Sequence, residues 1–512
     1  EGIISATDDD REGQIIADEI INYISPQKPV ERILLNEWTA EEVNRGLQNL
    51  KPNEEMKSLQ DAGFGRQIAD WLIGINLTSV ATLKYRNQKN IRLLNVGRVL
   101  MPTLKIIYDR DKEIADFKVT KYYKLKGIFQ TEDKKKFDSI YYIKAGEKFD
   151  NPEELKEIQE KIKDKNGEVV SKKITNKKEY PPYLFNLSGL QGYITSKYKG
   201  WTSDRVLKTA QQLYEKKFIT YPRTASVVLD ESLKEKTAKV LNIHKKSCPY
   251  EEMIQFKSTK RIFDSKKVES HSAIIPTYMQ PGSLNESERI VYEAVKNRFL
   301  AQFMPIAVAE DTVLHIKMQN TDIPGEFVAK GKVQLEAGWK LIEGIDAKET
   351  ILPAVKKGDV LPLIKSEINE VERKPPKPHT EKTLLKVMET CGKKYEEKEE
   401  EQMMMAILSG FSIGTPATRA ETIKKLKDAG YIKAKGKSLS CTDLGKILVE
   451  TFPARELFDL EYTGRLEKTL SDIERKKFTK DDFLAMIEQF VIESVDKIKN
   501  DIDDSHGGDT CL

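Results

Sequence analysis

Cysteine is scarce in this sequence, with four residues in 512 (Cys248, Cys391, Cys441 and Cys511), and no Cys-x-x-Cys pair occurs. This scatter argues against a disulfide framework and against a cysteine-based zinc ribbon. We therefore expect a chain without zinc in a reducing, intracellular compartment.

Long apolar runs are also missing. No uninterrupted stretch approaches the roughly 18 residues of a membrane-spanning helix, and no signal-peptide pattern is present. The sequence contains no Gly-x-x-x-x-Gly-Lys-Ser/Thr phosphate loop either. We therefore expect neither membrane contact nor use of ATP.

Neither sign of charge is in excess, because 85 lysines and arginines face 81 aspartates and glutamates. The net charge of +4 says little about partners, which only local clusters can indicate. One basic cluster consists of Lys424, Lys425, Lys427, Lys433, Lys435 and Lys437. The chain is too long for a single hydrophobic core, so we expect about three or more domains.

The most informative segment is Lys-Lys-Phe-Ile-Thr-Tyr-Pro-Arg-Thr-Ala-Ser, residues 216–226. Tyr221 precedes Pro222, and the residue before a proline is pushed to extended backbone angles, so this tyrosine lies on a non-helical turn. Arg223 then places a guanidinium on the same side of an extended chain. The segment predicts a phenol beside an anion-binding group. A buried turn tyrosine followed by a surface arginine is the alternative.

An acidic turn stands near the start of the sequence. The apolar segment 2–6 predicts a strand, and it is followed by Thr-Asp-Asp-Asp-Arg-Glu-Gly and a helical pattern over 14–24. Asp8, Asp10 and Glu12 recur at every second residue, so their carboxylates can converge and hold a hard cation such as Mg²⁺. Ordinary capping of the following helix is the alternative.

A candidate phosphate ligand occurs in Ser-His-Ser-Ala-Ile-Ile-Pro-Thr, residues 270–277. The imidazole of His271 can donate to a phosphate oxygen near neutral pH. A structural histidine before an apolar turn is the alternative. Arg98, in Asn-Val-Gly-Arg-Val, is a second candidate, and for it the alternative is a solvated charge at a helix start.

The C-terminal part contains Gly-Thr-Pro-Ala-Thr-Arg at 414–419, an amphipathic helix through Leu426 and a hairpin-like basic wing from Gly430. A helix followed by a basic wing is typical of nucleic-acid binding, for which well-placed lysines suffice. A solvated basic helix is the alternative.

Taken together and in their order along the chain, these segments resemble the type IA DNA topoisomerases, in particular the topoisomerase III branch, over about residues 1–485. The resemblance implies that Tyr221 is the nucleophile and that Arg223, His271 and Glu12 complete the catalytic group.

The acidic turn is similar to the second acidic motif of a Toprim domain, which implies that Asp8, Asp10 and Glu12 bind Mg²⁺. The resemblance also implies a set of DNA contacts, namely Arg11, Arg98, Thr418, Arg419, Lys435 and Lys437.

The activity implied by this family is ATP-independent, Mg²⁺-dependent cleavage of single-stranded DNA through a 5′-phosphotyrosyl intermediate, followed by strand passage and religation. Its outcome is relaxation of negative supercoils or decatenation. The implied partner is single-stranded or negatively supercoiled DNA, and we expect a monomer in the cytoplasm, associated with the nucleoid.

Three of the sequence's departures from the family bear on its activity. The family's first Toprim strand, with its Glu-Lys pair, is expected upstream of Glu1, Ala225 replaces an aspartate, and Leu100 and Met101 replace glutamine and threonine. These departures motivate an alternative function, a catalytically impaired homologue that binds single-stranded DNA. A Toprim nuclease or primase is a weaker alternative because it leaves Tyr221 unexplained.

We expect a multidomain α+β fold arranged as a toroid. Period-two alternation on both sides of a helical block predicts one discontinuous β domain. The expected parts are a partial Toprim domain without its first strand (1–45), a helical DNA-binding domain with a winged-helix-like segment (46–118 plus 373–500), a β-rich hinge domain (119–180 plus 305–372), a helical domain with the tyrosine (181–304) and a disordered tail (501–512).

Overall fold

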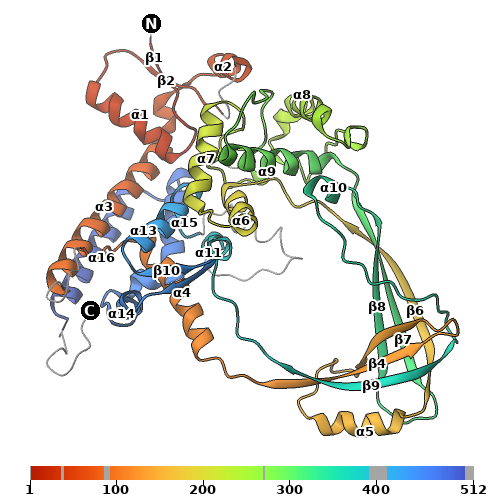
Figure 1. Ribbon diagram of the computed structural model, residues 1–512. Helices are drawn as coiled ribbons and strands as arrows, with labels where there is room; N and C mark the ends of the chain where they lie inside the picture. The colour runs from red at the N-terminus through yellow and green to blue at the C-terminus, as the bar shows by residue number, and fades with distance from the viewer. Residues whose placement is uncertain (1, 36–39, 86–92, 269–270, 391–411, 502–512) are drawn as a thin grey trace.

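The computed structural model describes residues 2–35, 40–85, 93–268, 271–390 and 412–501, and in it the chain closes into a ring (Figure 1). Residues 502–512 of the expected tail lie outside this part. Helices and strands are mixed, and the predicted multidomain α+β class is confirmed. The domain boundaries drawn from the sequence remain a prediction. None of the described helices is both long and apolar enough to cross a membrane.

The N-terminal module, residues 2–52, contains a small sheet. Its elements are β1 (Ile3–Ser5), α1 (Arg11–Ile24), β2 (Val30–Arg32), α2 (Ala40–Leu47) and β3 (Lys51–Pro52). β1 and β2 are parallel, so the chain must cross back between them, and α1 makes that crossing. β3 pairs antiparallel with β2. The acidic turn therefore lies at the carboxyl end of β1, the end at which α/β sheets commonly bind ligands.

The helical base is built from two stretches that are far apart in the sequence. Its helices are α3 (Lys57–Tyr85), α4 (Leu100–Ala115), α11 (Glu381–Glu389), α13 (Pro416–Asp428), α14 (Asp443–Thr451), α15 (Leu460–Glu474) and α16 (Lys480–Lys499), with the hairpin β10 (Ile432–Lys435) and β11 (Ser438–Cys441). One apolar core, which includes Leu104, Leu426 and Leu470, joins both stretches. Leu100 and Met101 are buried in it, so these two positions pack against protein.

A closed barrel forms the far side of the ring. Its strands are β4 (Lys121–Gln130), β5 (Lys136–Tyr142), β6 (Asn166–Glu179), β7 (Ala307–Met318), β8 (Glu326–Glu336) and β9 (Val360–Glu372), in the order β4-β5-β8-β7-β6-β9, and α5 (Pro152–Ile162) lies beside them. Phe327 fills the interior and contacts Phe129 and Tyr141, with ring centroids 5.4 Å apart in both pairs. Two ribbons leave the barrel (Figure 1): β4 with β9 runs to the base, and β6 with β7 runs to residues 181–304.

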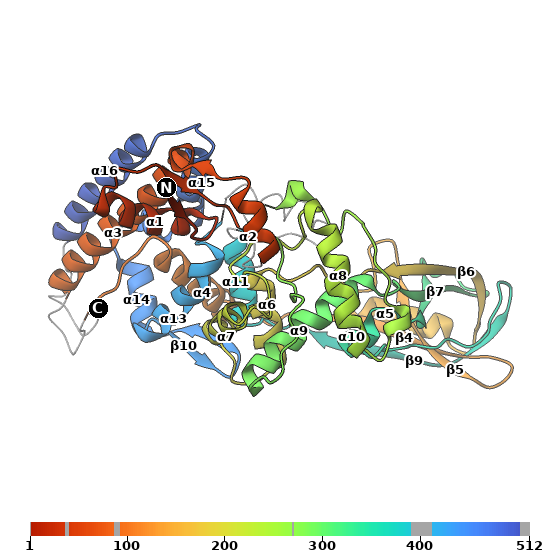
Figure 2. The same ribbon diagram turned by 90° about the horizontal axis from the view of Figure 1, so that it is seen from above.

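We call residues 181–304 the tyrosine block. Its helices are α6 (Leu187–Lys197), α7 (Ser203–Glu215), α8 (Lys234–His244) and α9 (Glu286–Phe303), and the short α10 (Lys340–Glu343) packs on α9. Seen from above, the block lies between the helical base and the barrel (Figure 2). It has apolar cores of its own around Phe299 and around Leu213.

Buried ion pairs organise the helical base. The Arg98 guanidinium, with 2% of its side chain exposed, donates to Asp70 and to Glu467, both at 2.7 Å. Because this guanidinium is buried and paired with both carboxylates, it is not presented to a phosphate at the surface. The expectation that Arg98 contacts DNA is therefore corrected: Arg98 ties α3 to α15.

The same network reaches the acidic turn. Arg11, at the start of α1, pairs with Glu474 and lies 3.6 Å from Glu467, so it too points into the base and not toward DNA. Glu12 pairs with Arg66 of α3. These contacts fix the first turn of α1, and with it the acidic turn, against the base.

Glu467 is the carboxylate at the centre of this network. Burial opposes its ionisation, but Arg98, Arg66 and Arg11 outweigh burial and lower the pKa of Glu467 to about 2. We expect Glu467→Gln to lower the free energy of unfolding of the base by up to about 3–5 kcal/mol at neutral pH, because it leaves buried guanidinium charge uncompensated. Urea unfolding followed by circular dichroism measures this difference.

The same comparison has a defined pH dependence. Because the folded pKa lies below the unfolded value of about 4.3, the stabilisation is complete above that pH and is lost as the pH falls toward 2. The difference in free energy of unfolding between the native protein and Glu467→Gln should therefore disappear over this pH range. A difference in free energy of unfolding that stays constant down to pH about 2 would contradict the assignment of Glu467 to these ion pairs. Glu461→Gln, on the exposed face of α15, is the matched control.

Candidate functional site

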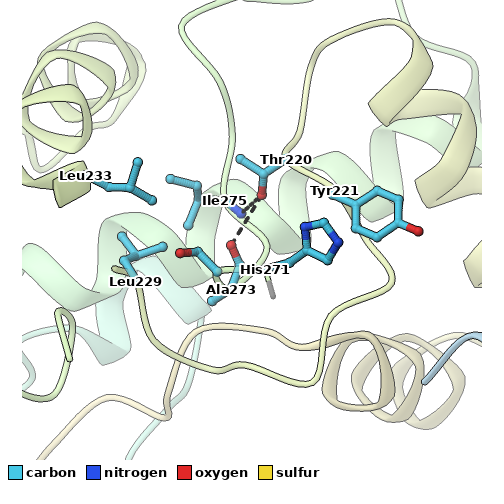
Figure 3. A pocket seen from close by; sticks show the side chains of 8 residues that line it. Thr220, Tyr221, Leu229, Leu233, His271, Ala273 and Ile275 are labelled. Atoms are coloured by element: carbon cyan, nitrogen blue, oxygen red, sulfur yellow. Dashed lines mark hydrogen bonds between the residues drawn. The ribbon is translucent and has the colours of Figure 1, made fainter. Parts of the chain in front are cut away.

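Two segments place the tyrosine and the histidine side by side. Thr220 receives the Ile275 N–H on its hydroxyl at 3.0 Å, and its own N–H donates to the Ile275 carbonyl at 2.9 Å. The Thr220 hydroxyl also donates to the Ala273 carbonyl at 3.3 Å. These bonds hold the segment before Tyr221 against the segment after His271. Both rings therefore lie beside the same small cavity (Figure 3).

Tyr221 is buried where the tyrosine block meets the acidic turn. Its ring lies 4.4 Å from the His271 ring and 5.3 Å from the Tyr214 ring, measured between centroids. Its hydroxyl lies 3.5 Å from a carboxylate oxygen of Asp10, a long hydrogen bond between residues 211 positions apart. The structure thus brings the phenol and the acidic turn, which come from distant segments, to one place.

The phenol is held in its neutral form. Burial raises the pKa of Tyr221 above its ordinary value, and the negative charges of Asp10 and Asp8 raise it further, while Arg223 acts in the opposite direction. Arg223 is exposed, so water weakens its effect. To act as a nucleophile, the phenol therefore needs a nearby proton acceptor and added positive charge.

His271 is buried, and neither of its ring nitrogens has a hydrogen-bond partner among the described residues. Burial lowers the pKa of His271, and Asp10, Asp9 and Asp8 oppose that shift. A buried polar side chain without a partner is costly, so this imidazole is suited to an added ligand with oxygen acceptors or donors.

The acidic turn caps α1. One Asp10 oxygen accepts the Gly13 N–H at 2.7 Å, so the helix-capping alternative holds for this oxygen while the other one faces Tyr221. Gly13 is needed here because a Cβ at this position would lie 2.1 Å from the Asp8 carbonyl oxygen. The turn therefore folds back tightly on the helix that it starts.

Arg32 was not singled out from the sequence, yet it supports the whole turn. Its fully buried guanidinium donates to the carbonyls of Thr7 at 2.9 Å and Asp8 at 2.6 Å, and to the Gln14 side chain at 3.0 Å. An arginine in a short strand carries no sequence signal for such a position. Asp9 was missed too: burial raises its pKa, and His271 and Arg32 counteract that rise.

The three carboxylates proposed as metal ligands do not form a ready-made metal site. Over the described residues, no group of three or more His, Cys, Asp or Glu side chains is arranged to hold a metal ion. Glu12 is turned away and paired with Arg66, whereas Asp8 and Asp10 remain beside the phenol. Since Mg²⁺ is commonly held by one or two carboxylates together with substrate phosphate and water, Asp8 and Asp10 are compatible with it.

Arg419 does not lie where a DNA contact would. Only 2% of it is exposed, and it donates to the carbonyls of Ile413 at 3.1 Å and Gly414 at 2.9 Å. These bonds hold the loop that leads into α13. As with Arg11 and Arg98, the expected phosphate contact is corrected to a role inside the protein.

The remaining predicted DNA contacts lie nearer the surface. The Thr418 hydroxyl accepts the Thr415 N–H at 3.1 Å in the first turn of α13 and is half-buried. Lys435 and Lys437 are exposed on the hairpin β10–β11, and Lys437 donates to the Ser196 carbonyl of the tyrosine block. The predicted helix and basic hairpin are thus present as structural elements.

Comparison with known proteins gives consistent matches. Residues 54–485 match a family described as DNA topoisomerase. DNA topoisomerase 3 of Staphylococcus epidermidis is 32% identical over 506 residues, which cover 97% of this chain and 68% of that protein. DNA topoisomerase 3 of Bacillus cereus is 32% identical over 519 residues, covering 97% and 69%. Among solved structures, full-length topoisomerase I of Thermotoga maritima superposes with a TM-score of 0.73 at 27% identity, covering 97% of this chain and 78% of that one.

The role of Arg32 can be tested by two substitutions. We expect Arg32→Met to destabilise the N-terminal module by about 1–3 kcal/mol for each carbonyl left unpaired, and to speed hydrogen–deuterium exchange across the acidic turn. Arg32→Lys keeps the charge but loses the planar fork, so it should restore only part of the stability. Full recovery with lysine would show that charge alone, and not the bonds to Thr7 and Asp8, holds the turn.

Proposed function

Since this chain belongs to the DNA topoisomerase family, as the type IA motifs of its sequence predicted, and is therefore an enzyme of the isomerase class, we propose that it cuts single-stranded DNA through Tyr221. It forms a 5′-phosphotyrosyl intermediate, passes a second strand through the break and reseals the first. No ATP is consumed. The outcome is relaxation of negative supercoils or decatenation of linked DNA.

The observation that carries this proposal is the meeting of three groups around the phenol. Tyr221 touches His271 and lies 3.5 Å from Asp10, although the three residues come from separate segments. A structural tyrosine would not require a buried histidine that lacks a partner in the described structure next to clustered carboxylates. Phosphoryl transfer needs a nucleophile, a proton acceptor and a phosphate ligand, and these are the groups present.

The chemical step exchanges one phosphodiester for another. The Tyr221 oxygen bonds to the phosphorus, the bond to the 3′-oxygen of the upstream nucleotide breaks, and that oxygen leaves as a 3′-hydroxyl after taking up a proton. The phenol proton passes to a carboxylate of the acidic turn, for which Asp10 is nearest in geometry. Because one ester replaces another, the step is close to isoenergetic and reverses when the 3′-hydroxyl attacks.

Protein groups around the phenol hold the phosphate. His271 donates from a ring nitrogen to a non-bridging oxygen, and exposed Arg223 neutralises the phosphate as it enters. Asp8 and Asp10 would hold Mg²⁺, which when bound adds the positive charge that this cluster of carboxylates and the developing phenolate require. Glu12 keeps Arg66 and α1 in place and has no direct contact with the phosphate.

DNA backbone contacts away from the phenol come from the surface of the base. Lys435 and Lys437 on the hairpin, with Thr418 at the start of α13, are the groups that remain accessible. Single-stranded DNA is the proposed substrate because Tyr221 is buried, and a flexible single strand reaches a buried phenol more easily than a stiff duplex. The protein acts as a monomer on the chromosome in the cytoplasm.

The nucleophile is tested with single-stranded oligonucleotides and Mg²⁺. With 3′-end label, denaturation should leave a protein–DNA adduct; with 5′-end label, it should release a free fragment, because the protein joins the 5′-phosphate. Tyr221→Phe should abolish the adduct. Tyr214→Phe is the matched control, since its ring lies next to Tyr221 and its loss should leave the adduct in place.

The other outcomes have defined meanings. Binding without any adduct by the native protein would support the alternative of a DNA-binding homologue. An adduct that survives in Tyr221→Phe but disappears in Tyr214→Phe would place the nucleophile on the neighbouring ring.

The metal requirement is a separate prediction. Chelation of divalent ions should stop plasmid relaxation, and Mg²⁺ should restore it. Asp8→Asn should raise the Mg²⁺ concentration needed for half-maximal relaxation, because one of two carboxylates is lost. Glu31→Gln, on β2 of the same module, is the control. Relaxation by Asp8→Asn with an unchanged Mg²⁺ requirement would remove Asp8 from the proposed metal site.

A further inference from the structure

The tyrosine block joins the ring covalently only through the β6–β7 ribbon, and every contact that it makes with the helical base is noncovalent. α6 and α7 of the block lie on α11 and α13 of the base. The buried apolar clusters of the described residues stop at this boundary: one lies within the base, and those of the block contain no residue of the base. Separation of the two parts would therefore divide none of these clusters.

The contact at the centre of this boundary is a helix cap supplied from the other side. Ser203 is the first residue of α7, so its N–H has no partner within the helix. It donates to the carboxylate of Glu381, the first residue of α11, at 2.5 Å. Ser203 is 1% exposed and Glu381 is 9% exposed. A carboxylate at a helix N-terminus is favoured both by the orphan amides and by the helix dipole.

Weaker polar contacts surround this cap. The Asn186 side chain donates to Glu389 at 3.4 Å, and Arg419 donates to the Ser188 hydroxyl at 3.4 Å. At the rim, Lys437 reaches the Ser196 carbonyl. In each pair the base contributes the charged partner and the block contributes a neutral one.

This division of charge makes the boundary reversible. The charges of the base are already paired with one another, Glu381 with Lys427 and Glu389 with Arg419. When the block leaves, these pairs persist and become hydrated, so no isolated buried charge is created in either state. A boundary of this kind holds two parts in a defined position and still releases them at low cost.

We propose that Glu381 is the latch of the ring: it caps α7 of the tyrosine block, and opening of the ring consists of the release of this cap. The proposal rests on the proposed function in one respect, because strand passage requires the tyrosine block to move away from the base while DNA is attached to Tyr221. Glu381 thereby sets the fraction of time that the ring is open.

A buried thiol in place of the Ser203 hydroxyl measures this opening without DNA. That hydroxyl is buried and has no hydrogen-bond partner in the described structure, so Ser203→Cys removes no bond. The rate at which a maleimide modifies the thiol introduced by Ser203→Cys, followed by mass spectrometry of its peptide, reports opening. Adding Glu381→Gln replaces a charge-assisted bond by a neutral one and should raise this rate about tenfold.

Glu461→Gln is the matched control, because it breaks an exposed ion pair with Arg465 on α15, a helix that does not carry the cap. It should leave the labelling rate unchanged. Thermal unfolding of each variant separates opening from loss of the fold. Equal labelling rates in the native background and in Glu381→Gln, with both proteins folded, would overturn the latch.

A disulfide staple tests the same boundary during catalysis. A Cβ placed on Gly192 of α6 would lie 3.5 Å from the Lys382 Cβ of α11, which is within the usual span of a disulfide of about 3.5–4.5 Å. The oxidised double variant Gly192→Cys, Lys382→Cys should still form the Tyr221 adduct with a short single strand. It should lose plasmid relaxation, and a reductant should restore it. The two single variants are the controls.

The two proposals fail in different ways. If the native protein forms no adduct, the proposed function fails, while the labelling comparison still decides on the latch. If the adduct forms and the oxidised double variant relaxes plasmid at the native rate, the ring opens elsewhere and the latch proposal is refuted.

Discussion

The approach of the Tyr221 hydroxyl to Asp10 joins two parts of the closed ring, and the proposed chemistry depends on it. The two residues belong to different parts of the molecule, which the chain connects only by way of the base and the barrel. Neither side chain forms the proposed site alone, because the phenol comes from the tyrosine block and the carboxylates come from the N-terminal module. The closed ring thus assembles the site from both parts.

Buried arginines position each side of this contact. Arg32 holds the acidic turn, Arg98 ties α3 to α15, and Arg419 holds the loop before α13. A buried guanidinium is tolerated only when several acceptors meet it in a fixed geometry, so each of these residues selects one arrangement of the chain around it. The boundary at Glu381 is different, because the charges there are paired on one side and the bonds across it go to neutral groups. Buried arginines with several acceptors thus fix the rigid parts, whereas single bonds to neutral groups cross the separable boundary.

Sequence reasoning was most reliable where a local pattern carries the information. The proline after Tyr221, the acidic turn between strand and helix, and the helix followed by a basic hairpin all appear in the structure as local features. It was wrong for Arg11, Arg98 and Arg419, which were expected to contact DNA. An arginine that neutralises phosphate and one that neutralises a buried glutamate have the same side chain, and Glu467 and Glu474 lie more than 360 positions from Arg98 and Arg11 in the sequence.

The amino-acid sequence was enough to identify the family, the α+β class and the candidates Tyr221, His271 and the acidic turn. Each of these is recognised from a pattern of residues close together in the chain. Only the folded ring decided that the phenol meets Asp10, that Glu12 faces Arg66 instead of the other carboxylates, and that Glu381 caps a helix of another block. These facts depend on distances between segments hundreds of residues apart, and such distances are set by packing and by the burial of charge, which no local pattern specifies.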